Sequence, residues 1–241
     1  PSPSFTHHLL PGSTMSTPLL SPRSSTLHCG SDVWVESSAA DSPWVSGKII
    51  GMGDGGTVQV QLSPPDGRGL PERMDVPQTK LAPRDPESLL NVADLVNLGT
   101  VNEPNVLAAL SLRFARHTMY TTTGDVLIAV NPYQRIPSLY SPKMISAYTS
   151  HQARGSGNGA PLAPHVYTIA ASAFAAMSTG ISENDGATRA ILVSGESGSG
   201  KTETCKILLE YFASQQIKRT GIEVQVLKST PILEAFGNAQ T

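Results

Sequence analysis

Charge and cysteine are both scarce in this 241-residue sequence. Charged residues make up 15% of the chain, against about a quarter in an average protein, and the formal net charge is −2. This balance excludes a charge-swollen disordered chain, and it provides no strong field to attract nucleic acid or anionic lipid. Cys29 and Cys205 lie far apart in the sequence, which excludes a disulfide framework and favours a reducing compartment. No membrane span is expected, because even Ile169–Met177 falls short of the ~18 apolar residues that cross a bilayer.

The first 31 residues also lack charge, since Arg23 is their one basic residue and they contain no carboxylate. They are rich in Ser, Thr, Pro and His. Such a segment buries too little apolar surface to offset the entropy of ordering it, so residues 1–31 are predicted to be a disordered extension. The alternative is an organelle transit segment, a class that is also poor in acids but richer in arginine.

Residues 32–82 contain short β-forming runs separated by Gly, Pro and Asp. The clearest are Val33–Val35, Val45–Ile50 and Val58–Leu62. Short strands closed by turns predict a small SH3-like β-barrel. Its Trp34 and Trp44 would either line a peptide or methyl-lysine site or pack within the fold, and packing is the favoured interpretation.

Helical and strand-like patterns alternate through the remaining residues, 83–241. Asn102 is a good N-cap with Pro104 in the first turn, and Leu107, Leu110 and Phe114 would mark the buried face of that helix. Further helices are expected from Pro142 and over Val166–Met177. The apolar runs Asp125–Val130 and Ala190–Ser194 are typical of strands covered on both faces. This alternation predicts an α/β fold, with a mostly parallel sheet flanked by helices.

A phosphate-binding motif follows the second run. Gly195–Thr202 reads Gly-Glu-Ser-Gly-Ser-Gly-Lys-Thr and satisfies G-x-x-x-x-G-K-[ST]. The glycines let successive N–H groups bind phosphate oxygens, Lys201 adds a positive charge, and Thr202 offers a hydroxyl to Mg²⁺. Apolar residues repeat with helical spacing after the motif, so a helix N-terminus is expected to favour the anion. The motif predicts Mg-nucleotide binding, and the alternative is an ordinary Gly-rich turn.

Other parts that phosphoryl transfer needs are missing from the sequence. No apolar strand ending in aspartate follows Thr202, and no N-K-x-D motif that reads guanine is present, which disfavours a GTPase. We therefore expect the hydrolytic machinery to lie outside this chain, which reads as truncated.

Four stretches in order resemble the N-terminal part of a myosin motor domain, a P-loop ATPase. They are the phosphate loop with its flanks (Ile191–Glu203), the strand and purine loop (Tyr120–Tyr133), a helix start (Pro164–Tyr167) and the approach to the first nucleotide-sensing switch (Ser229–Ala239). The resemblance covers residues 32–241, including the SH3-like module, and would end just before the first switch. The segment around Trp34 is similar to plant-type and class V-like branches.

The resemblance implies roles for individual residues. Lys201 and Ser197 would serve catalysis, Thr202 would bind Mg²⁺, and Glu203 would face the purine or simply complement the helix dipole. Gln134 stands where the family often has lysine or arginine. The residues implied to contact ATP are Gly195, Glu196, Ser197, Gly198, Ser199, Gly200, Lys201, Thr202, Glu203, Asn131, Pro132, Tyr133, Gln134, Arg135 and Tyr140.

The family implies an actin-activated Mg-ATPase that moves along actin filaments, in the cytoplasm and associated with the cytoskeleton. Actin and calmodulin-like light chains would bind outside these residues, and the 241 residues alone are expected to lack turnover. Two alternatives are another P-loop ATPase or kinase, and a scaffold that joins an SH3-like reader to a nucleotide-binding remnant.

Overall fold

The computed structural model describes residues 27–38, 43–64, 70–90, 92–153, 162–179 and 189–215, together with Gln225 and Ser229. Most of the predicted extension, and all but the first residue of the expected switch approach (Ser229–Ala239), lie outside the described residues. Within the described part, no helix is both long enough and apolar enough to span a bilayer.

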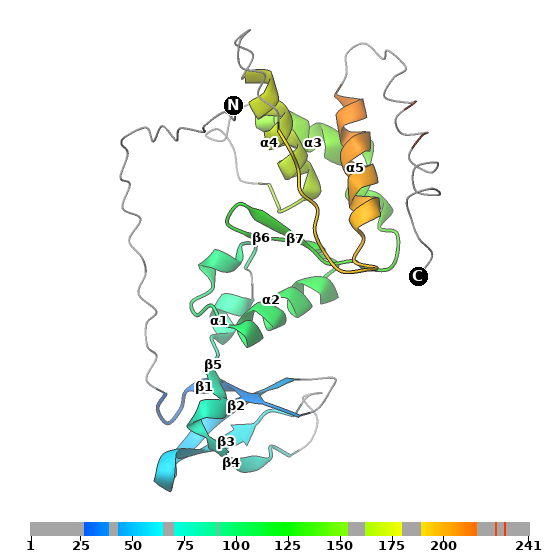
Figure 1. The fold of residues 1–241 in the computed structure, drawn as a ribbon. Coiled ribbons are helices and arrows are strands. Elements are labelled where there is room, and N and C mark those ends of the chain that lie inside the picture. Colours follow the sequence, from blue (N-terminus) through cyan, green and yellow to red (C-terminus); the bar gives the residue numbers. More distant parts are fainter. Residues whose placement is uncertain are drawn as a thin grey trace, which may run out of the picture.

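The N-terminal sheet consists of five antiparallel strands in the order β4-β3-β2-β1-β5 (Figure 1). Its strands are β1 (Asp32–Glu36), β2 (Trp44–Met52), β3 (Thr57–Leu62), β4 (Arg73–Pro77) and β5 (Leu81–Pro83), with short 3-10 turns η1 (Asp54–Gly56) and η2 (Gln78–Lys80). The three strands predicted from the sequence are confirmed as parts of β1, β2 and β3. Alternate residues of these strands point inward, so valines and Ile49 form an apolar core.

Two helices connect this sheet to the rest of the molecule. They are α1 (Pro86–Leu89) and α2 (Glu103–Ala115), with the 3-10 turn η3 (Leu95–Asn97) between them. Asn102 is the N-cap of α2, as predicted, and its side chain accepts a hydrogen bond from the backbone N–H of Asn105 (2.9 Å). The predicted buried face is wrong, because Leu107 is 45% and Phe114 41% exposed. Helix α2 instead turns Asn105 and Ala109 inward, toward the apolar cluster around Leu89 and Leu95.

A β-hairpin lies beyond α2 and consists of β6 (Tyr120–Thr123) and β7 (Val126–Ala129). Gly124 supplies the positive φ (61°) that its two-residue turn requires. Burial of Asp125–Val130 on both faces is confirmed only in part. Leu127 and Ile128, on opposite faces of β7, pack against different apolar clusters, whereas Val126 is 60% exposed. Within the described residues, β7 pairs with β6 alone.

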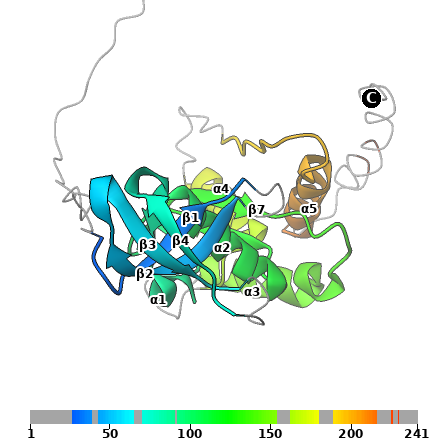
Figure 2. The same ribbon diagram turned by 90° about the horizontal axis from the view of Figure 1, so that it is seen from below.

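Three helices pack together on the far side of the hairpin from α2. They are α3 (Pro142–Ala153, after the 3-10 turn η4, Pro137–Tyr140), α4 (Val166–Thr179) and α5 (Lys201–Ser214). They enclose an aromatic core that includes Tyr148, Tyr167 and Tyr211. Seen from below, the N-terminal sheet lies at one side of the molecule and α5 at the other (Figure 2).

Residues Ala190–Ser194, predicted to be a buried strand, run extended in Figure 1 but form no ladder with any described strand. Ile191 and Val193 pack against the aromatic core, whereas Leu192 between them is 91% exposed. The described residues therefore form a mixed structure of helices and antiparallel sheets. Its one parallel pairing among these residues is an isolated bridge between Asp94 and Thr122.

Candidate functional site

The phosphate-loop motif forms a tight bend that runs directly into α5. Gly198 and Gly200 have φ angles of 77° and 94°, in the left-handed region that side chains other than glycine rarely adopt. Gly200 is the N-cap of α5 and supplies no side-chain cap. The first helical hydrogen bond is donated by Thr204 N–H to Gly200 O (2.9 Å). The N–H groups of residues 201–203 therefore precede the helical hydrogen-bond ladder and form the positive end of the helix dipole.

Lys201 folds back across the loop that precedes it. Its ammonium group donates hydrogen bonds to the carbonyl oxygens of Gly195 (2.8 Å) and Glu196 (2.7 Å). An ammonium group has three donors, so one N–H remains beyond these two bonds. Next to it, the side chains of Thr202 and Glu203 are exposed in the first turn of α5. The motif thus gathers a positive charge, backbone N–H groups and a hydroxyl-bearing residue at one helix end.

The loop that leaves β7 lies against this bend. Asn131 Nδ2 donates a hydrogen bond to the carbonyl oxygen of Gly198 (2.8 Å), which is 67 residues away in the sequence. Asn131 Oδ1 accepts a hydrogen bond from the backbone N–H of Tyr133 (2.9 Å) and closes an Asx turn. The two segments that the sequence singled out separately are therefore brought side by side.

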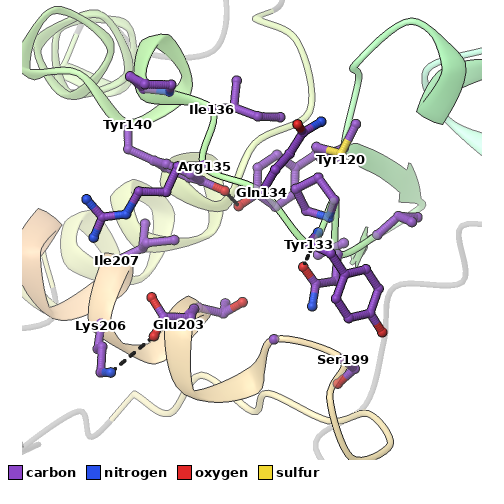
Figure 3. A pocket seen from close by; sticks show the side chains of 18 of the residues that line it. Tyr120, Tyr133, Gln134, Arg135, Ile136, Tyr140, Ser199, Glu203, Lys206 and Ile207 are labelled. Atoms are coloured by element: carbon purple, nitrogen blue, oxygen red, sulfur yellow. Dashed lines mark hydrogen bonds and ion pairs between the residues drawn. The ribbon is translucent and has the colours of Figure 1, made fainter. Parts of the chain in front are cut away.

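A cavity of about 770 Å³ opens between these two loops and the first turns of α5 (Figure 3). Its size is in the range of small-molecule sites. Of the predicted site residues, those that line it are Asn131, Pro132, Tyr133, Gln134, Arg135, Tyr140, Ser199, Gly200 and Glu203. The remaining ones do not line it; Gly195, Glu196, Ser197, Gly198, Lys201 and Thr202 belong to the neighbouring bend and the first residues of α5.

Several cavity residues were not anticipated from the sequence. Ile207 and Glu210 follow Glu203 at positions i+4 and i+7 on α5, so the helical period of that helix was a signal that could have revealed them. Lys206 also lines the cavity and forms an ion pair with Glu203 (3.1 Å). Tyr120 reaches the cavity from β6, and only the tertiary fold places it there.

The inner wall of the cavity is formed by two tyrosines, of which Tyr120 is buried and Tyr140 is partly buried. The hydroxyl groups of Tyr120 and Tyr140 are hydrogen-bonded to each other (2.9 Å). Burial raises the pKa of both phenols above the usual value, and for Tyr120 the hydrogen bond that it shares with Tyr140 raises it further. Both groups therefore stay neutral over the physiological range and act as hydrogen-bonding, not charged, wall residues.

His165 fixes this wall from behind. Its Nδ1 accepts a hydrogen bond from the backbone N–H of Tyr167 (3.1 Å), so Nε2 carries the proton and donates to Leu139 O (3.1 Å). These partners define a neutral imidazole, and burial lowers the pKa of His165 to about 4. The ring also contacts Tyr120 and Tyr140. The cavity wall is thus held in place by a buried histidine.

Residues 92–241, more than half of the chain, match the family described as myosin head (motor domain). Among curated proteins of Arabidopsis thaliana, the chain is similar to Myosin-11 (39% identity over 220 residues), Myosin-17 (39% over 217) and Myosin-14 (37% over 221). The alignments cover 88%, 88% and 90% of this chain and 13% of each relative.

The chain belongs to the myosin head (motor domain) family. The resemblance inferred from the motifs is thereby confirmed, and the relatives are plant proteins, in line with the plant-type likeness of the segment around Trp34. Family membership favours the motor interpretation over an unrelated P-loop ATPase and over a scaffold. The chain spans about an eighth of the length of these relatives.

Proposed function

We propose that this chain is the ATP-binding part of an actin-based motor, which couples hydrolysis of Mg-ATP to movement along actin filaments. The observation that supports this most directly is the hydrogen bond between Asn131 and Gly198 O, because it joins the phosphate loop to the loop expected to hold the purine. A cavity of nucleotide size lies between these loops. The motor activity is proposed because the chain belongs to the myosin head (motor domain) family.

The phosphates and Mg²⁺ fit the chemistry of the bend and the start of α5. Anions are favoured where an uncapped helix begins, and the backbone around Gly198 and Gly200 has no side chain to obstruct their approach. Lys201, with one N–H beyond its two loop carbonyls, would donate to a phosphate oxygen, and Ser197 would contribute from the loop. Thr202 would hold Mg²⁺, which when bound neutralises charge on the phosphates.

The adenosine end fits the cavity beside the bend. Pro132, Tyr133, Gln134, Arg135 and Tyr140 line the cavity on one side, and Glu203 lines it from α5. The wall offers apolar surface around Tyr120 and Ile207 with a few polar groups, a composition typical of a site for a flat heterocycle. Gln134 is neutral, so we expect no ionic contact at that position.

In the proposed architecture, residues 83–241 are the N-terminal part of a P-loop NTPase-type domain with a mostly parallel sheet. The extended segment around Leu192, which is 91% exposed, would pair in the longer protein with strands that the described residues do not include. Residues 32–82 would be an SH3-like module, because β5 returns to pair with β1, and residues 1–31 a disordered extension.

The partners of the whole protein follow from the same proposal. Actin filaments and calmodulin-like light chains would bind to regions outside this chain, and the protein would work in the cytoplasm in association with the cytoskeleton. Nucleic acid is not among the proposed partners, since the net charge of −2 provides no strong field for it.

Substitution of the phosphate-loop lysine tests the proposal. In the full-length protein, Lys201→Ala is expected to weaken binding of a fluorescent ATP analogue about 100-fold and to abolish actin-stimulated ATP hydrolysis, because a charge-assisted contact to phosphate is lost. Lys143→Ala, which removes one exposed charge at the start of α3, is the matched control and should leave both unchanged. Wild-type affinity in Lys201→Ala would contradict the proposal.

A further inference from the structure

We infer that Asn131 is a positioning residue, which sets the spacing between the two halves of the nucleotide site by tying the phosphate loop to the purine-side loop. The inference rests on the proposed function and assigns this side chain a role other than direct contact with the base. Asn131 makes two hydrogen bonds through opposite ends of its amide. Nδ2 donates to Gly198 O (2.8 Å), and Oδ1 accepts from Tyr133 N–H (2.9 Å).

The two partners fix the orientation of the amide. A carbonyl oxygen can only accept and a backbone N–H can only donate, so the nitrogen of Asn131 must face Gly198 and the oxygen must face Tyr133. No other uncharged side chain of this length offers a donor and an acceptor side by side. A single side chain therefore spans a junction between segments 67 residues apart.

The backbone on the purine side is strained at this junction. Tyr133 has a φ of 52°, a left-handed conformation that costs about 1–2 kcal/mol for a residue with a side chain. Tyr133 is 82% exposed, so burial of its side chain does not offset that cost. The Asx turn from Asn131 Oδ1 does stabilise the conformation. Strain held by a specific contact is a recurrent feature of functional sites.

On the phosphate side, two glycines lie near Asn131 and Tyr133. A Cβ placed on Gly200 would be in ordinary van der Waals contact with Cγ of Asn131 (3.7 Å), and one placed on Gly198 would lie 3.9 Å from the hydroxyl of Tyr133. The two loops are therefore close neighbours at these glycines, in addition to being joined by the hydrogen bond. Residues of both loops line the cavity beside this junction.

A ligand that contacts both loops binds more tightly when their spacing is fixed, whereas the affinity of a ligand that contacts only one loop does not depend on that spacing. When two half-sites are already aligned, binding at the second costs little additional entropy. ATP reaches the phosphate loop with its phosphates and the cavity with its adenosine. Pyrophosphate has only the phosphate part. Loss of the Asn131 bridge should therefore lower the affinity for ATP and leave the affinity for pyrophosphate unchanged.

Binding of Mg-ATP and of Mg-pyrophosphate to the full-length protein tests this, with Asn131→Ala and Asn131→Ser compared. Neither variant has a donor that reaches Gly198 O, but the serine hydroxyl is able to accept from Tyr133 N–H and to retain the turn. We expect both variants to bind ATP about 10-fold more weakly, the equivalent of one hydrogen bond, and to bind pyrophosphate within about 2-fold of wild type.

Three results would overturn the inference. If the variants bind ATP and pyrophosphate equally weakly, the substitution damages the phosphate loop itself. If they bind ATP with wild-type affinity, the Asn131 bridge has no role. If Asn131→Ser alone regains wild-type ATP affinity, only the turn at Tyr133 matters. Lys201→Ala, which should lose both ligands, is measured in parallel. If that variant binds ATP like wild type, the proposed function fails, and this failure is distinguishable from failure of the inference about Asn131.

Discussion

The indole N–H of Trp34 in β1 donates a hydrogen bond to Oδ1 of Asn105 in α2 (2.8 Å). Asn105 is fully buried, and its Nδ2 donates to Pro83 O (3.2 Å) and Thr100 O (2.9 Å). The guanidinium carbon of Arg84 lies 4.9 Å from the centre of the Trp34 ring and covers it. Trp34 therefore packs at a junction between the N-terminal sheet and α2, as favoured from the sequence, and is not an open aromatic site.

Asn105→Ala should lower the free energy of unfolding by about 2–4 kcal/mol, because it leaves the Trp34 N–H and Thr100 O without this partner in a buried place and removes one of two donors to Pro83 O. Asn97→Ala, at an exposed position of η3, is the matched control and should change it by less than about 0.5 kcal/mol. Urea denaturation followed by circular dichroism measures both. A cost below about 0.5 kcal/mol for Asn105→Ala would show that the junction is not held by this amide.

Arg113→Lys should destabilise the protein by about 2–3 kcal/mol, since lysine cannot reproduce the fan of hydrogen bonds. The guanidinium group of Arg113 donates to Thr121 Oγ1 (2.7 Å), Val92 O (2.9 Å) and Tyr120 O (2.7 Å), and so ties α2 to β6. Arg116→Lys is the comparison, because Arg116 donates a hydrogen bond to Leu90 O (2.7 Å) at an exposed site. Equal melting temperatures for the two variants would contradict the role of the Arg113 hydrogen bonds in holding α2 to β6.

The free energy of unfolding should fall as the pH drops from about 6.5 to about 4. Burial lowers the pKa of His165 to about 4 in the folded state, against 6.5 for the free side chain. The unfolded chain therefore binds a proton first, and neutral His165 stabilises the fold fully above pH 6.5 and progressively less below it. The loss is at most about 1.4 kcal/mol per pH unit, about 3 kcal/mol in total.

His165→Gln should remove this slope, measured as the difference between the wild-type and variant unfolding free energies across that window. His117→Asn serves as the control, because His117 is exposed and has a φ of 56°, a conformation that asparagine tolerates. If the unfolding free energy of His165→Gln depends on pH as strongly as that of the wild type, other groups cause the acid sensitivity.

Gly200→Ala should weaken ATP binding at least about 10-fold, since alanine disfavours the φ of 94° at this residue, which is the N-cap of α5 and lies beside Asn131 at the junction of the two loops. Gly124→Ala supplies the contrast. It also has a positive φ (61°), but nothing lies within 4 Å of the added Cβ. We expect Gly124→Ala to lose about 1 kcal/mol of stability with unchanged ATP affinity, as measured by titration with a fluorescent analogue. Similar ATP affinities for the two variants would contradict the role assigned to the backbone of Gly200 at this junction.

Local sequence patterns predicted the positions of helices and strands well, but not which face of each element is buried. The strands around Val33 and Val58 and the N-cap at Asn102 are where the sequence placed them, because alternation and capping depend on neighbouring residues. The orientation of α2 was mispredicted, since the packing that turned Asn105 inward comes from Trp34 and Pro83. Apolar spacing alone gave no warning that an amide would be buried in preference to Leu107.

The chemistry of the phosphate loop was readable from residues 195–202 alone, because glycine conformations, a lysine and a helix start are local properties of a short motif. The motif alone did not predict which segment lies opposite that loop, and only the family resemblance indicated it. The contact of Asn131 with Gly198, the tyrosine wall at Tyr120 and the neutral state of His165 all join residues distant along the chain. Such contacts follow from how the hairpin and helices pack, so the tertiary structure alone decided the shape of the site.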